Sequence, residues 1–133
     1  DAIPMPDRSF DVVCAFQVLE HMPFDISMKA LREMCRVARK SVAISLPEAG
    51  NCWPNTISIP YVRRIRLHLK NPFKKPTKHV FDGEHYWEIG KQGYELRNIM
   101  SAIKSNAPEN CRITTYRVHE NPYHRFFILD FFR

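Results

Sequence analysis

The first third of the chain alternates between apolar runs and an amphipathic stretch. Residues 10–16 form a near-continuous apolar run, which is typical of a buried strand in a parallel sheet. Over residues 25–40 apolar side chains recur at helical spacing, and Asp25 is suited to cap the start of that helix. A second apolar run spans residues 41–46. This order of strand, helix and strand predicts half of a parallel α/β crossover unit.

The rest of the chain has a less regular pattern. Prolines divide residues 49–92, and we interpret this stretch as an insertion or lid because it is too long for an ordinary connection. Within it, apolar residues four positions apart predict one basic amphipathic helix over residues 57–69. Residues 94–104 are the next predicted helix. Residues 112–118 and 125–132 are predicted strands, paired as an antiparallel hairpin.

The composition fits one globular domain. The 133 residues are 44% hydrophobic and 26% charged, and no apolar run approaches the ~20 residues that cross a bilayer. Two cysteines, Cys14 and Cys35, fall in predicted core elements, and Cys52 and Cys111 complete a set without zinc-type spacing. We therefore expect reduced thiols, a cytoplasmic setting and no bound metal.

The net charge of +6 originates largely in one stretch. No acidic residue lies between Glu48 and Asp82, and the cations there include Arg63, Arg64, Arg66, Lys70, Lys74, Lys75 and Lys78. A solvated surface is the commonest role of such charge. The alternatives are recognition of an anionic acceptor, peripheral contact with anionic lipid through the predicted helix, and nucleic acid binding, for which no RNA-binding signature is visible.

Residues 9–21 join the first apolar strand to a polar turn that ends in Glu20-His21. This segment resembles the second half of a class I S-adenosylmethionine-dependent methyltransferase domain of the small-molecule type. The resemblance implies an α/β fold, the carboxyl half of a Rossmann-like sheet that is mostly parallel and ends in an antiparallel hairpin. In that family the sheet has seven strands, so residues 1–133 would be a partial domain from the fourth strand onward.

The resemblance also implies which residues bind the cofactor, S-adenosyl-L-methionine. Asp1-Ala2 matches the pair that contacts the adenine, and the alternative is a chain end without a ligand. The residues that line the methionine portion would be those after the strand: Ala15, Phe16, Gln17 and Val18. The alternative is that Phe16 and Val18 pack under the next helix. Both interpretations can hold together.

Two further groups are candidates for chemistry on the acceptor. His21 could take a proton from a substrate hydroxyl or amine, although fixing the loop by hydrogen bonds is the favoured alternative. Residues 85–94 resemble a segment that leads into the helix after the fifth strand in a bacterial subset of the family, and the aromatic rings with the histidine suit a substrate-side lid made by His85, Tyr86 and Trp87. The alternative for these three residues is an ordinary turn before the next helix.

The function implied is methyl transfer to an unidentified small-molecule acceptor, mainly through proximity and orientation. No glycine-rich turn precedes residue 10, so we expect the donor to need a missing N-terminal half of the domain. That half would also pair with the open edge of residues 10–16. Without it we expect the chain to be inactive and unstable. The alternative is a non-catalytic, truncated module that binds an anionic polymer or a partner through its basic insertion.

Overall fold

A computed structural model gives the fold of the chain. It describes residues 2–49, 52–59, 63–70, 75–118 and 121–132.

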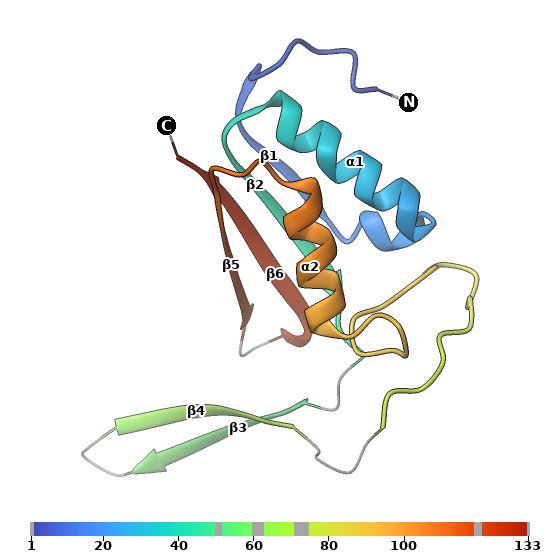
Figure 1. The fold of residues 1–133 in the computed structure, drawn as a ribbon. Helices are drawn as coiled ribbons and strands as arrows, with labels where there is room; N and C mark the ends of the chain where they lie inside the picture. Colours follow the sequence, from blue (N-terminus) through green and yellow to red (C-terminus); the bar gives the residue numbers. More distant parts are fainter. Residues whose placement is uncertain (1, 50–51, 60–62, 71–74, 119–120, 133) are drawn as a thin grey trace.

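A mixed four-stranded sheet forms the centre of the molecule, with the strand order β1-β2-β6-β5 (Figure 1). Its strands are β1 (Phe10–Phe16), β2 (Ala38–Pro47), β5 (Cys111–Val118) and β6 (Asn121–Phe131). Strands β1 and β2 are parallel, whereas β6 is antiparallel to both β2 and β5. The predicted α/β class and the predicted order of strand, helix and strand are confirmed.

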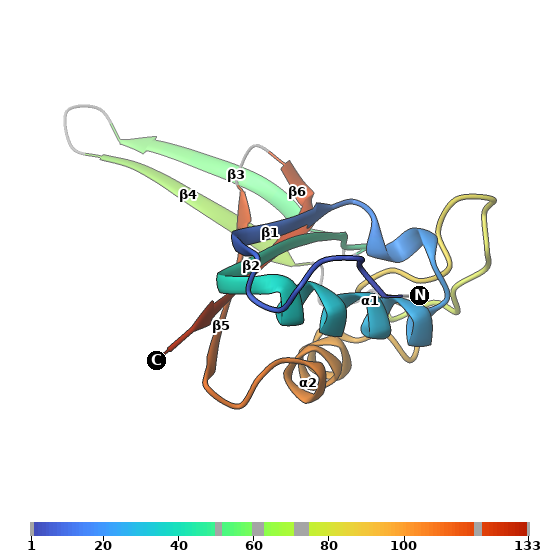
Figure 2. The same ribbon diagram turned by 90° about the horizontal axis from the view of Figure 1, so that it is seen from above.

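Two helices, α1 (Phe24–Val37) and α2 (Leu96–Asn106), cover the same face of this sheet (Figure 2). The core lies between them and the sheet, where Leu31, Ile44, Ile99, Ile103 and Phe127 are fully buried. Burial of one such side chain stabilises a fold by roughly 1.5–3 kcal/mol. These contacts hold β1 and β2, and therefore the ends of both strands, in fixed positions.

The other face of β1 is open. Side chains alternate along this strand, so Ala15 faces the helices while Val12 and Phe16 are each 52% exposed. The expectation of a buried strand was wrong, because in the described part of the chain β1 is an edge strand and neither helix covers its outer face. Cys14 is exposed for the same reason and does not lie in the core, whereas Cys35 is buried as predicted.

Helix α1 begins one residue before the predicted cap. Pro23 occupies the N-cap position, and Asp25 lies in the first turn without capping the helix. A carboxylate there still interacts favourably with the helix dipole. Residues before β1 are fastened to this helix by Arg36, whose guanidinium donates to the carbonyls of Ile3 and Met5 at 2.9 Å each.

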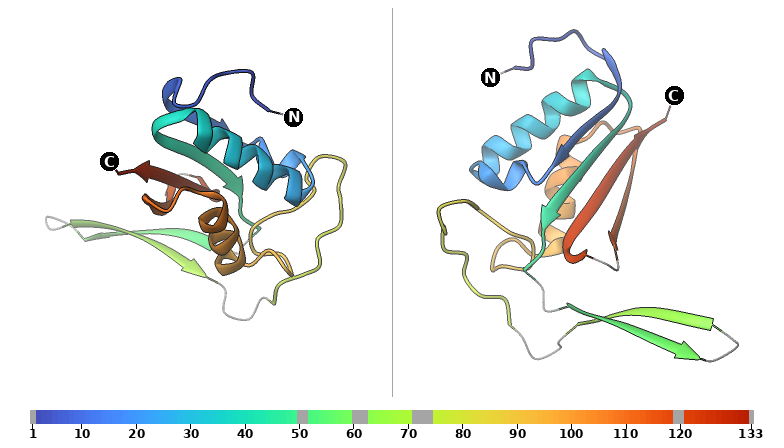
Figure 3. Two further views of the ribbon diagram at one scale, coloured as in Figure 1. Left: turned by 45° about the horizontal axis from the view of Figure 1, so that its top comes forward. Right: turned by 180° about the vertical axis from the view of Figure 1, so that it is seen from behind.

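The predicted helix over residues 57–69 is absent, and this prediction was wrong. Strands β3 (Cys52–Ile59) and β4 (Arg63–Lys70) form a separate two-stranded antiparallel sheet there. This ribbon projects from the body of the molecule (Figure 3). Peripheral lipid contact was argued from an amphipathic helix, so it loses that basis. Neither α1 nor α2, the α-helices of the described residues, is long and apolar enough to span a bilayer.

After the ribbon the chain returns to the carboxyl ends of β1 and β2. Ile89 forms a parallel bridge with Glu48, and its backbone N–H donates to the carbonyl of Pro47 at 3.0 Å. The N–H of Tyr86 donates to the carbonyl of Glu20 at 2.8 Å. The stretch from Tyr86 to Ile89 is thereby fixed against the residues that follow β1.

Candidate active site

Strand β1 ends in a strained turn. Gln17 has a φ of 55°, in the left-handed region that residues other than glycine seldom adopt. Ser45 on β2 holds this conformation, since its carbonyl and its Oγ each accept from the Gln17 N–H at 3.2 Å. The Gln17 amide also donates to Ser45 Oγ at 3.0 Å. The turn directs the chain away from the sheet and leaves Phe16 and Val18 52% and 47% exposed.

A short 3-10 helix, η1 (Leu19–His21), follows this turn, and its three side chains differ in burial. Leu19 and Glu20 are buried, and His21 is exposed. The hydroxyl of Ser27 in α1 donates to the carbonyl of Leu19 at 2.6 Å, which fixes η1 against α1. Local packing of Leu19 therefore determines where Glu20 and His21 lie.

The segment from Asp82 to Glu88 supplies a second histidine. Asp82 Oδ1 accepts from the N–H groups of Glu84 and His85 at 2.9 and 2.8 Å, and these bonds lower the pKa of its carboxyl group. Gly83 between them has a φ of 100°, which the turn requires and which suits glycine. His79 Nε2 lies 2.8 Å from the carbonyl of His85. The backbone of His85 is thus fixed from two sides.

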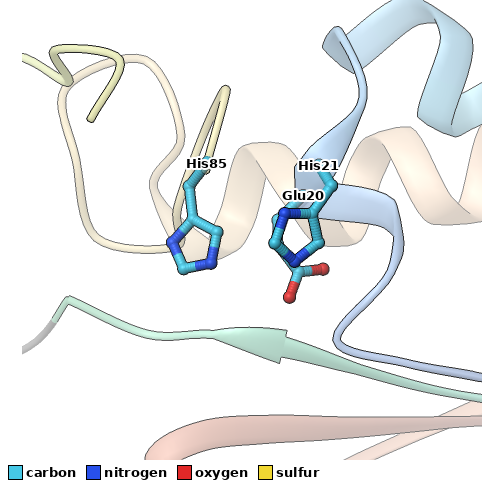
Figure 4. A group of neighbouring side chains, drawn as sticks. All are labelled: Glu20, His21 and His85. Carbon is cyan, nitrogen blue, oxygen red and sulfur yellow. The ribbon is translucent and has the colours of Figure 1, made fainter. Parts of the chain in front are cut away.

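Glu20, His21 and His85 point toward one another (Figure 4). The two imidazole rings have centroids 5.0 Å apart, and one ligand atom from each of the three residues lies within 4.8 Å of the others. Sequence reasoning singled out each histidine, but on separate grounds. The sequence did not predict that the two histidines lie next to each other and next to Glu20.

The carboxylate of Glu20 is buried without a hydrogen bond. Its side chain has 0% exposure, and within the described residues neither oxygen has a hydrogen-bond partner. Burial raises the pKa of Glu20, an effect that the nearby backbone N–H and the charges of His21 and His85 only partly offset. An uncompensated buried carboxylate is costly, and such groups concentrate at functional sites.

Hydrogen bonds assign the tautomers of both histidines. His21 Nδ1 lies 2.9 Å from the carbonyl oxygen of Glu84, and His85 Nδ1 lies 3.0 Å from Glu88 Oε1. A carbonyl or carboxylate oxygen only accepts, so each Nδ1 carries the hydrogen. In the neutral form both Nε2 atoms then hold lone pairs and can bind a proton or an ion.

Trp87 anchors the segment that contains His85 against the residues around Met22 and Phe24. It is fully buried, and its indole N–H donates to the carbonyl of Met22 at 3.1 Å. Its ring also packs edge-on against Phe24 at a centroid distance of 5.0 Å. Trp87 therefore has no contact with solvent, so a substrate-side role fits His85 and the 45% exposed Tyr86 better than it fits this indole.

The remaining predicted residues have different surroundings. Asp1 lies outside the described residues, and Ala2 is exposed at the start of the segment that Arg36 holds along α1. Ala15 is 9% exposed with its side chain toward the core, so only its backbone is available to a ligand. Phe16 and Val18 are exposed and do not pack under α1, which makes that alternative wrong.

An ionic cluster at the end of β2 was missed in the sequence. Glu48 binds Arg117 on β5 and Arg125 on β6, with Arg125 Nε 2.8 Å from Glu48 Oε2. Burial alone would raise the pKa of Glu48, but the hydrogen bonds from both guanidinium groups outweigh it and the pKa is lowered. The cluster ties three strands together close to the site.

Comparison with known protein families found a match for the first part of the chain. Residues 1–46 match the family model described as a methyltransferase domain. This match confirms the resemblance to a class I S-adenosylmethionine-dependent methyltransferase domain over β1, α1 and nearly all of β2. His85 lies outside the matched stretch. The comparison with curated proteins found no match.

Proposed function

We propose that the chain is the carboxyl part of a methyltransferase domain that transfers a methyl group from S-adenosylmethionine to a small-molecule acceptor. The observation that carries this proposal is the turn after β1, inside the matched stretch, where exposed Phe16 and Val18 flank Gln17 beside His21. Ligands of open α/β sheets bind at the carboxyl ends of strands. The acceptor chemistry would therefore take place at the end of β1.

The topology is consistent with a Rossmann-like methyltransferase sheet from its fourth strand onward. The last strand, β6, is antiparallel to β2, as the resemblance implies for the final strand of the family sheet. Strand β5 is antiparallel to β6 and so has the direction of β1 and β2. On this proposal the stretch of about residues 49–92 is the insertion, and the β3–β4 ribbon belongs to it.

The residues after β1 fit a sulfonium nucleoside on one side. Phe16 and Val18 offer exposed apolar surface at the point where the chain leaves β1. When bound, S-adenosylmethionine supplies an electrophilic methyl group. Phe16, Gln17 and Val18 would hold its methionine portion, and Ala2 with Asp1 would contact the adenine.

His21 and Tyr86 would act on the acceptor side. In its neutral form His21 carries the hydrogen on Nδ1, so its Nε2 can take a proton from an acceptor hydroxyl or amine. The Glu84 carbonyl fixes the ring orientation for this transfer. Tyr86 is exposed and stacks near Phe81, with ring centroids 4.7 Å apart, and these two rings would shield one side of the acceptor.

The opposite wall of the site would come from additional polypeptide. The free edge of β1 and its outer face, including Phe10 and Val12, are apolar and exposed. An unpaired apolar edge favours pairing with another strand. We propose that the amino-terminal half of the domain covers this edge, supplies the glycine turn and is needed for activity.

A second function is favoured by the β3–β4 ribbon. The ribbon projects from the body, and its β4 strand contains Arg63, Arg64, Arg66 and Lys70. A projecting basic strand pair suits an anionic polymer or an anionic acceptor. A non-catalytic module of this kind would bind such a polymer and would not bind the methyl donor.

Donor binding by the intact protein tests the proposed function. We expect Phe16→Ala to weaken binding of S-adenosylhomocysteine by about tenfold or more, which corresponds to about 1.4 kcal/mol. Isothermal titration calorimetry measures this change. Phe132→Ala is the matched control, because Phe132 is similarly exposed at 49% but lies at the other end of the sheet.

The three outcomes of that titration differ in meaning. Loss confined to Phe16→Ala supports the site. Equal affinity for all three proteins would place the donor elsewhere in the molecule. No binding by a folded wild-type protein that also contains the amino-terminal half of the domain would exclude the methyltransferase function and leave the binding module.

A further inference from the structure

We propose that Glu20, His21 and His85 bind a divalent transition-metal ion through one carboxylate oxygen of Glu20 and the Nε2 atoms of the two histidines. The three residues come from η1 and from the segment after the β3–β4 ribbon, and one ligand atom of each lies within 4.8 Å of the others. The inference does not depend on methyl transfer, since it is argued from the geometry of this cluster alone.

The first support is the state of Glu20. Its carboxylate is fully buried, is aimed into the cluster and has no hydrogen-bond partner among the described residues. Buried carboxylates are ordinarily paired or coordinate a metal. The two neighbouring rings do not donate to it, because their Nδ1 hydrogens point to Glu84 and Glu88. A cation between the three groups would compensate this charge.

The second support is the outer partner of each imidazole. A histidine that binds a metal usually donates its other ring N–H to a carbonyl or a carboxylate, which fixes the tautomer and the ring. His21 does so with the Glu84 carbonyl at 2.9 Å, and His85 with Glu88 at 3.0 Å. Both rings are thus oriented as metal ligands before any ion binds.

A rival grouping of Asp82, His85 and Glu88 is less suited to an ion. Its members also have ligand atoms within 4.8 Å of one another. However, one Asp82 oxygen already accepts two backbone N–H groups, and Glu88 accepts from His85 and pairs with Lys91. The Asp82 carboxylate therefore already stabilises the turn, and the Glu88 carboxylate already accepts from His85. The Glu20 carboxylate has no such hydrogen bond among the described residues.

The ligand set indicates the class of metal. Two imidazoles and one carboxylate suit Zn²⁺, Fe²⁺ or Mn²⁺ better than Ca²⁺ or Mg²⁺, which prefer sets made of oxygen ligands. Three protein ligands leave coordination positions for water or a substrate oxygen. His21 is exposed, so such a position is open to solvent next to the turn after β1.

Direct metal titration of the intact protein tests the inference. After treatment with a chelator, we expect one Zn²⁺ per chain by equilibrium dialysis, and Co²⁺ should give visible d–d absorption. His21→Gln and His85→Gln should each weaken Zn²⁺ binding more than about tenfold and change the Co²⁺ spectrum. Both rings are partly or wholly exposed, so these variants should fold, and circular dichroism checks this.

A matched control removes a carboxylate elsewhere. Glu109→Gln removes an exposed carboxylate outside the cluster. It should bind Zn²⁺ within about twofold of the wild type. Absence of stoichiometric Zn²⁺ in the folded wild-type protein, or an equal loss in Glu109→Gln, would overturn the inference. Zn²⁺ binding without donor binding would leave it standing and would reject only the methyltransferase proposal.

Discussion

Single residues at the end of β1 have environments that their sequence neighbours do not share. Glu20 is fully buried and His21 is exposed, although they are adjacent in η1. The 3-10 geometry of η1 is consistent with this difference, because successive side chains of such a helix are about 120° apart and face different surroundings. A sequence motif such as Glu-His therefore identifies the chemistry but not which member faces solvent.

Cysteine reactivity is a prediction at this scale. Cys14 is exposed on β1, whereas burial raises the pKa of the Cys35 thiol to about 12. The thiolate is the reactive species, so Cys35 should stay almost entirely protonated near neutral pH. We expect iodoacetamide at pH 8 to alkylate Cys14 at least about tenfold faster than Cys35. Peptide mass spectrometry over time measures both rates, and similar rates would show that α1 opens readily.

At the scale of elements, β1, α1 and β2 could be predicted because two apolar runs flank one stretch of helical spacing. The stretch over residues 57–69 fits both a helical and a strand period. Ile57, Ile65 and Leu69 are separated by multiples of four, which fit one face of a helix but also one face of a strand. Ile59 and Leu67 lie two positions from these residues and favour the strand. Spacing by four alone could not decide.

The meeting of elements far apart in the chain was beyond prediction. His85 reaches His21 because Ile89 pairs with the end of β2 and Trp87 packs beside Phe24. Neither contact could be inferred from the neighbouring sequence, since both depend on the path of the chain after the β3–β4 ribbon. Glu48 was visible as the end of a strand, but its two arginine partners belong to strands whose order in the sheet was not known.

Acid stability is a prediction for the strands that Glu48 joins. The folded pKa of Glu48 lies below its ordinary value of 4.5, so its stabilising effect is complete above that pH. The effect is lost as the pH falls through the folded pKa. We expect Glu48→Gln to lower the free energy of unfolding by about 3–5 kcal/mol at pH 7, because two buried guanidinium groups lose their counter-charge.

Chemical denaturation at several pH values measures this effect. The variant should also lose less stability than the wild type between about pH 5 and pH 3. Glu109→Gln is the control, since that exposed carboxylate should change stability by no more than about 0.5 kcal/mol. A Glu48→Gln variant as stable as this control would show that the cluster contributes little.

At the scale of the whole molecule, the described residues leave one face of the four-stranded sheet covered by helices and the other without helices. Helices α1 and α2 cover the first, while Phe16, Phe126 and Tyr116 form a row of aromatic contacts across the second. Strand β1 therefore combines an exposed apolar face with an edge that pairs with no other strand in the described part of the chain. The open edge of residues 10–16 was predicted from the family resemblance, whereas the row of aromatic contacts is a property of the assembled sheet.

Self-association is the prediction at this scale. Because β1 has an apolar face and a free edge, we expect the isolated 133-residue chain to associate at micromolar concentration. Val12→Lys places a charge on that edge and should shift the population toward monomer in analytical ultracentrifugation. Val80→Lys is the control, because Val80 is 76% exposed and lies away from the sheet. A monomeric wild-type chain would contradict the expectation.

The anchoring of Trp87 has a consequence for how molecules reach His21 and His85. The indole is fixed under Met22 and Phe24, and the residues on both sides of it bond to the backbone of Glu20 and Pro47. Lifting this segment would break all of these bonds at once. This segment is therefore a fixed wall beside His21 and His85 and not a hinged flap.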